Sequence, residues 1–146
     1  MKFSGKAEIG MSQKRVFGLL NSPEAISKLI PGVQGFSKNG EEADMEVMVG
    51  LSFIRGKFKV KVKPVTMREP EYVELKGSGA GAGSSIDFLA KFNIRGINDK
   101  QSEILWDADV NVGGIAATFG SGMIKSAADK FISQIIEGLK KEAGES

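Results

Sequence analysis

One long amphipathic segment near the end of the chain, residues 115–141, limits most strongly what this sequence can fold into. Apolar side chains recur there at every third or fourth position, which predicts a helix that buries a broad face. At ~1.5 Å per residue this helix would extend over roughly 40 Å, so a sheet that covers it must curl along its length. We therefore expect one long helix held by one curved sheet. The repeating apolar positions are Ala116, Phe119, Met123, Ala127, Phe131, Ile135 and Leu139.

Side-chain size changes along this predicted helix. Its first half is rich in alanine and glycine, and its second half carries large side chains such as Phe131 and Ile135. Gly120 and Gly122 would each cost a helix interior about 1 kcal/mol relative to alanine, which indicates a close approach or flexibility there. We expect open space between the first half and the sheet. Close packing of the helix onto the sheet is the alternative.

The rest of the chain predicts a sheet with one apolar face. Apolar and polar residues alternate at residues 2–9, and two short helices follow, with Ser12 and Ser22 as their N-caps. Alternating runs continue from Val33 to Val112, separated by turn signals at residues 39–40, 69–70, 77–83 and 98–99. We expect an α+β fold in a single domain over residues 1–146. Its order would be strand, two short helices, six antiparallel strands and the long helix.

Composition excludes several kinds of catalytic site. The chain has 0 cysteines and 0 histidines, so thiolate and imidazole chemistry are absent. In the predicted alternation the acidic residues fall on the outer face, and a one-residue slip would bury them all. We therefore expect no catalytic residues, no metal and no cofactor. An enzyme of the cyclase or hydrolase type is the alternative, and it would need Glu74 or Asp107 inside the fold.

A run of five cations at alternate positions, from Arg55 to Lys63, raises the possibility of nucleic-acid binding. If the hairpin turns at residues 52–53, the acids of the preceding strand lie opposite most of these cations. Only Arg55 and Lys57 would lack an opposite acid, and the net charge is only +2. We expect an ion-paired surface and no nucleic-acid partner. The predicted pairs are Lys59 with Glu46, Lys61 with Asp44 and Lys63 with Glu42.

The predicted hairpin tip is apolar, whereas hairpin tips are usually polar. Leu51, Phe53 and Ile54, with Arg55 and Lys57 beside them, are candidates for contact with a partner or a membrane surface. The tip could instead gate a cavity, or pack on the helices of its own domain. The first ten residues lack a signal-peptide core, and no apolar run approaches the ~18 residues of a membrane span. We expect a cytoplasmic protein.

Several short motifs, taken together with the order of elements, resemble one family over nearly the whole chain. It is the family of the carbon monoxide dehydrogenase G subunit, which lies within the START-like helix-grip superfamily. The motifs are Phe3-Ser4-Gly5, Val16-Phe17, Leu20-Asn21, Pro23-Glu24, Ile30-Pro31-Gly32, Gly56-Lys57-Phe58, the stretch 77–83, Trp106-Asp107-Ala108-Asp109, Val112-Gly113-Gly114, Phe119-Gly120 and Ala127-Ala128.

This resemblance implies a seven-stranded antiparallel sheet, curved around the long C-terminal helix and enclosing an apolar cavity. It also implies an accessory role beside molybdenum hydroxylases of the carbon monoxide dehydrogenase type, in handling a lipid- or quinone-like molecule or in peripheral contact at the inner face of the membrane. A docking protein that holds no ligand is a further alternative. We expect the hydrophobic ligand to be lined by Leu29, Ile30, Val47, Phe58, Val60, Phe88, Phe92, Trp106, Ala108, Phe119, Gly120 and Met123.

Overall fold

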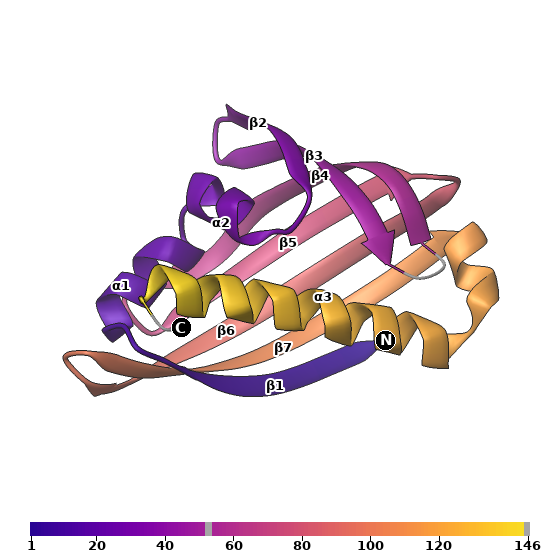
Figure 1. The fold of residues 1–146 in the computed structure, drawn as a ribbon. Helices are drawn as coiled ribbons and strands as arrows, with labels where there is room; N and C mark the ends of the chain where they lie inside the picture. The colour runs from indigo at the N-terminus through magenta and orange to yellow at the C-terminus, as the bar shows by residue number, and fades with distance from the viewer. Residues whose placement is uncertain (52–53, 145–146) are drawn as a thin grey trace.

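The structure is a computed structural model that describes residues 1–51 and 54–144. A strand and two short helices are followed by six strands, a 3₁₀ helix and a long α-helix, as Figure 1 shows. This order agrees with the one expected from the sequence. The elements are β1 (Lys2–Ile9), α1 (Gln13–Leu20), α2 (Pro23–Leu29), β2 (Val33–Asn39), β3 (Glu42–Leu51), β4 (Ile54–Arg68), β5 (Tyr72–Gly81), β6 (Ser84–Asn98), β7 (Gln101–Gly114), η1 (Ile115–Phe119) and α3 (Ser121–Glu142).

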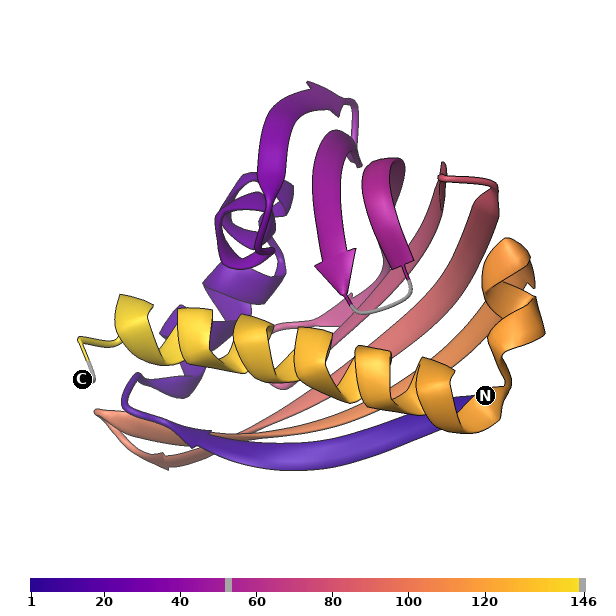
Figure 2. The ribbon, with the colours of Figure 1, turned by 45° about the vertical axis from the view of Figure 1, so that its right-hand side comes forward.

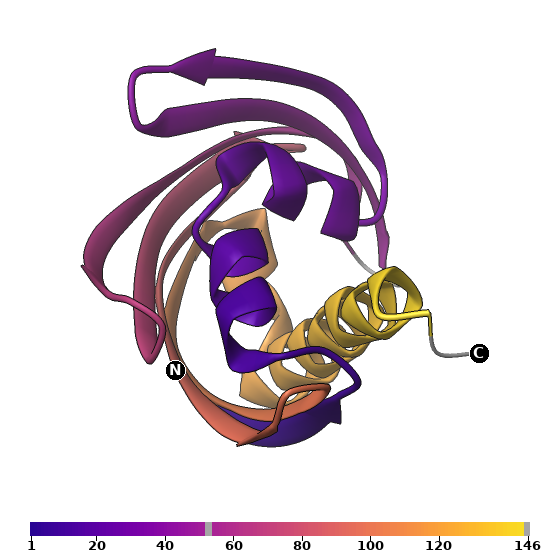
Figure 3. The ribbon, with the colours of Figure 1, turned by 90° about the vertical axis from the view of Figure 1, so that its left-hand side faces the viewer.

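All seven strands form one antiparallel sheet in the order β1-β7-β6-β5-β4-β3-β2. The sheet curves, and α3 runs across its concave side (Figure 2). The view along the helix shows α1 and α2 on that same side, beside the C-terminal end of α3 (Figure 3). The predicted curved sheet around a long helix is therefore confirmed.

The tightly packed core lies at the end of the molecule where α1 and α2 cover the sheet. Ile9, Val16 and Val73 are completely buried there, and Leu139 of α3 is 1 % exposed. Both short helices begin as expected, because the hydroxyl oxygens of Ser12 and Ser22 accept hydrogen bonds from backbone N–H groups three residues later. The C-terminal half of α3 is thus anchored in the core.

The glycine-rich stretch that was expected to form a turn lies mostly within a strand. Gly77 and Gly79 pair with Phe88 and Ile86 as part of the ladder between β5 and β6. The turn itself is confined to Ala82 and Gly83, which take positive φ angles of 51° and 73°. A two-residue hairpin needs that backbone conformation at its tip, whereas the preceding glycines are free to extend the strand.

The segment predicted as one continuous helix is divided in two at Gly120. Residues 115–119 form the 3₁₀ helix η1, and Gly120 has a φ of 85° before α3 begins at Ser121. Glycine adopts this left-handed conformation without steric cost, which ends one helix and redirects the chain into the next. A Cβ at Gly120 or Gly122 would meet no atom within 4 Å, so of the two alternatives, close approach and flexibility, no close approach occurs at these glycines.

Candidate functional site

The middle of the concave sheet face carries a band of apolar side chains that are only half-buried. Their neighbours on the same face, such as Val73 and Ile104, are completely or almost completely buried under α1 and α2. Several side chains of the band pack against the edge of the core, and each side chain of the band keeps part of its surface accessible to solvent. Its members include Val60, Ile86, Phe88, Ala90, Phe92, Trp106, Ala108 and Val110.

The side of α3 that crosses this band is also incompletely covered. The apolar side chains Phe131, Ile132, Ile135 and Ile136 are half-buried. The helix makes its main contacts with α2, β1 and η1, at the margins of the concave face. Two incompletely covered apolar surfaces thus face each other, and the space between them is the candidate binding cavity.

Two aromatic rings lie flat on glycines of neighbouring strands. A Cβ built on Gly5 of β1 would be 2.4 Å from a ring carbon of Trp106, its partner on β7. A Cβ on Gly77 of β5 would meet the ring of Phe88, its partner on β6. Each glycine leaves room for a ring against the sheet, so the ring occupies the wall and not the space beneath α3.

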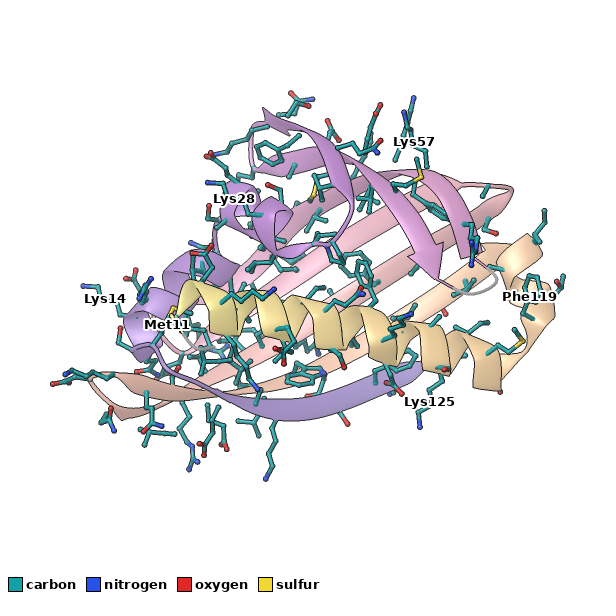
Figure 4. All side chains as sticks on the ribbon, in the orientation of Figure 1. Met11, Lys14, Lys28, Lys57, Phe119 and Lys125 are labelled. Carbon is teal, nitrogen blue, oxygen red and sulfur yellow. The ribbon has the colours of Figure 1, made fainter. Side chains whose placement is uncertain are left out.

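The twelve expected ligand-lining residues fall into three groups. Val60, Phe88, Phe92, Trp106 and Ala108 lie together on the half-buried concave band, and Ile30 is half-buried at the end of α2. The structure places Leu29, Val47 and Phe58 among tightly buried side chains, and it places Phe119, Gly120 and Met123 on the exposed surface near the start of α3. Figure 4 shows Phe119 at that end of the molecule.

Sequence reasoning did not include the middle of α3 among the lining residues. Ile132, Ile135 and Ile136 were expected to help fill the core because they are large. All three are half-buried, and Ile135 and Ile136 pack against the core cluster. The helical periodicity already placed them on the face toward the sheet. Side-chain size alone gave no sign that these residues would stay partly exposed.

The two acids that could have supported an enzyme lie on the outer face of the sheet. Asp107 is exposed, and Glu74 accepts a hydrogen bond of 2.7 Å from the hydroxyl of Tyr72. Tyr72 is two residues from Glu74 on β5, so both side chains project from the same face. Among the described residues, no group of three acids gathers in a way that could hold a metal ion.

Tyr72 is the only tyrosine of the chain, and its surroundings favour its neutral form. Burial raises the pKa of Tyr72 above its ordinary value of 10.0, and the hydrogen bond to Glu74 raises it further. The guanidinium of Arg68, 4.4 Å from the ring centre, opposes this effect. The outer face thus holds an ordered polar cluster at the start of the middle strand, β5.

We expect Tyr72 to ionise at a higher pH in the folded protein than in the urea-unfolded chain. The neutral phenol then contributes stability that is complete below about pH 10 and is lost as the pH rises through the folded-state pKa. Tyrosinate absorbance in the near ultraviolet measures this midpoint directly. Glu74→Gln should lower the midpoint, because it removes the negative charge beside the phenol. Equal midpoints in folded and unfolded protein would contradict the described cluster.

The basic face of β4 lies beside acids of β3 in the register expected from the sequence, and two of its cations form ion pairs with diagonal neighbours. Asp44 and Lys61 are direct partners in the ladder, as predicted. The ion pairs, however, are diagonal: Lys57 with Glu46 at 3.6 Å and Lys61 with Glu42 at 4.0 Å. Lys57 has no acid directly opposite, as predicted, because its ladder partner is Met48, but its long side chain reaches the diagonal neighbour Glu46.

The apolar hairpin tip predicted as a contact surface falls largely outside the described residues. Residues 52 and 53 are not described, and neither are the side chains of Leu51 and Ile54. The contact role predicted for Phe53 and its neighbours therefore stays a prediction. Arg55 and Lys57 are exposed on β4, and Lys57 projects from the outer face (Figure 4).

A pocket of about 370 Å³ lies at β2, β3 and β4. Its lining is mixed, with charged residues such as Asp44 and Lys61 and apolar residues such as Phe36 and Val60. Within the described part of the chain, no helix is long and apolar enough to cross a membrane.

Comparison with known proteins decides the family. The sequence pattern of the carbon monoxide dehydrogenase G subunit (CoxG) matches residues 5–144. The chain belongs to the CoxG family. No curated protein matches this CoxG chain significantly in sequence.

Solved structures show that this CoxG-family chain has a START-like fold. A conserved protein from Geobacillus kaustophilus superimposes with a TM-score of 0.92 at 21% identity, covering 99% of this chain and 95% of that one. A START superfamily protein from Mycobacterium smegmatis gives a TM-score of 0.76 at 13% identity, covering 98% and 97%. At these identities the likeness shows the fold alone. The predicted family and the predicted START-like architecture are both confirmed.

Proposed function

We propose that this CoxG-family protein binds a hydrophobic, lipid- or quinone-like molecule between the sheet and α3, without catalysing a reaction on it. The observation that carries this proposal is the pair of half-buried apolar surfaces that face each other across the concave side of the sheet. No acidic or basic side chain of the described strands belongs to the half-buried band on this face. A ligand there would meet aliphatic and aromatic groups.

The free-energy cost of leaving an apolar space unfilled favours a bound ligand there. An unfilled apolar cavity costs roughly 24 cal/mol for each Å³, because the side chains around it lose contacts that a close-packed core would supply. A ligand restores part of those contacts and stabilises the folded state through its binding free energy. The flat rings of Trp106 and Phe88 on the cavity wall are suited to stack on a planar head such as a quinone.

The family description supports an accessory role for this binding. The proposed partner is a molybdenum hydroxylase complex of the carbon monoxide dehydrogenase type, with peripheral contact at the inner face of the membrane as the source of the ligand. Exposed apolar side chains could make such contacts, since Ile115, Phe119 and Met123 are 57%, 37% and 44% exposed around the start of α3. The same side chains favour the second candidate function, a docking protein without a ligand.

Quenching of Trp106 fluorescence should detect a quinone in the proposed cavity. Trp106 is the only tryptophan and belongs to the half-buried band, so a quinone with a short isoprenoid tail should quench it saturably. The same head without a tail should bind at least tenfold more weakly, because each buried CH₂ contributes about 0.8 kcal/mol. The urea-unfolded chain serves as the control for collisional quenching.

Native mass spectrometry of the protein from its own host should also show a lipophilic passenger. Quenching that increases linearly, as in the unfolded chain, together with spectra free of any passenger would contradict the binding role. In that case docking through Ile115, Phe119 and Met123 becomes the better account of the protein.

A further inference from the structure

A small pocket lies beside the candidate cavity, where α3 passes the end of β3. Its volume is about 140 Å³. Val49 and Phe131 contribute to it, and both are half-buried apolar residues that belong to the two elements enclosing the concave space. The pocket therefore includes apolar side chains of both elements that border the concave space. Its lining consists of Pro31, Gly32, Met48, Val49, Gly50, Lys130, Phe131 and Gln134.

The pocket exists because β2 does not extend along the whole of β3. The last ladder pair between these strands is Val33 with Val47, and the N–H of Met48 donates to the carbonyl of Gly32 at 2.8 Å. Backbone groups of alternate residues in a strand point to the same side. The N–H of Gly50 therefore points in the same direction as the N–H of Met48, toward the side on which β2 pairs. Because β2 does not extend this far, none of the described strands lies there to accept its hydrogen bond.

Two side chains of α3 add further hydrogen-bond donors to this pocket. Lys130 and Gln134 are one helical turn apart, so they project from the same side of the helix. Both are exposed, and within residues 1–51 and 54–144 Lys130 takes part in no ion pair. Among the described residues, no carboxylate contributes to the lining. An ammonium, an amide and a backbone N–H thus surround one opening to an apolar space.

We infer that this pocket is the head-group site for an amphiphile with a carboxylate head, such as a long-chain fatty acid, whose tail enters the cavity between the sheet and α3. A carboxylate accepts from all three kinds of donor, and hydrogen bonds to an ionised acceptor are about twice as strong as neutral ones. A neutral head could not use the charge of Lys130. The inference rests on the proposed hydrophobic binding and names the class of ligand.

Paired ligands that differ only in their heads test this inference. Hexadecanoic acid and hexadecanol have the same tail, and Trp106 fluorescence reports the binding of either one. At a pH where the acid is ionised, we expect wild-type protein to bind the acid about tenfold more tightly than the alcohol. Lys130→Met should remove this preference by weakening the acid alone, while the affinity for the alcohol stays the same.

Lys125→Met is the matched control for this substitution. Lys125 is an exposed lysine of the same helix, and its side chain lies on the side of α3 away from β3 (Figure 4). It should leave both affinities unchanged. Equal binding of acid and alcohol by the wild type, or an equal effect of both lysine substitutions, would overturn the head-group site while leaving the cavity intact. Failure of both ligands to bind would instead overturn the proposed function.

Discussion

Leu139→Ala is expected to destabilise the protein by about 2–5 kcal/mol, the usual cost of removing a large aliphatic side chain from a close-packed core. Leu139 is 1 % exposed among side chains of α1, α2 and the sheet, so the remaining residues cannot readily fill the space. Urea unfolding followed by Trp106 fluorescence measures the free energy of unfolding. The effect should be large because Leu139 fastens the C-terminal half of α3 to the core.

Met123→Ala is the matched control on the same helix. Met123 is 44% exposed near the start of α3, and surface substitutions of this kind usually change stability by less than about 0.5 kcal/mol. The contrast between the two variants would show that α3 is anchored at one end. A cost below about 1 kcal/mol for Leu139→Ala, or an equal cost for both, would contradict this arrangement.

Gly5→Ala is expected to displace the ring of Trp106 into the cavity and to weaken binding of a hydrophobic ligand at least tenfold. The added Cβ would lie 2.4 Å from the ring, far inside van der Waals contact, so the indole must lift from the sheet. Overpacking of this kind typically costs 1–3 kcal/mol, and it should cost least where the ring has open space to enter. Ligand titration and the emission maximum of Trp106 report binding and ring position separately.

Gly18→Ala controls for the general effect of replacing a glycine. A Cβ at Gly18 meets nothing within 4 Å, and the residue lies inside α1, where alanine is favoured by up to about 1 kcal/mol. This variant should be slightly more stable and should bind ligand as the wild type does. Unchanged Trp106 emission in Gly5→Ala would show that the glycine does not determine where the ring lies.

The sheet was predictable from the sequence because a one-residue shift in the register of any of its strands would be strongly unfavourable. Inward residues such as Phe88 and Trp106 alternate with outward residues that include Asp87 and Asp107, and a slip by one position would bury every charge on the strand. The alternation therefore indicated both the strands and the face that points toward α3. It also placed Glu74 and Asp107 outside, where the structure has them.

Structural features that depend on packing between distant elements were not predictable from the alternation of apolar and polar residues. Apolar periodicity continues through Gly120, so nothing in the pattern marked the positive φ that separates η1 from α3. Leu29 and Val47 share an apolar pattern with Val60, yet only the positions of α1 and α2 decide which of them are tightly covered. The head-group pocket likewise depends on where β2 stops pairing with β3, which no local pattern specifies.

The glycines beneath the aromatic rings have a consequence for how the binding preference of such a protein can evolve. The volume of the proposed cavity depends on Gly5 and Gly77, which lie behind Trp106 and Phe88 and need never touch a ligand. A single methyl group at either position would tilt a ring and reshape the space, while every residue in contact with the ligand stays the same. Closely related chains with identical lining residues could therefore select ligands of different sizes.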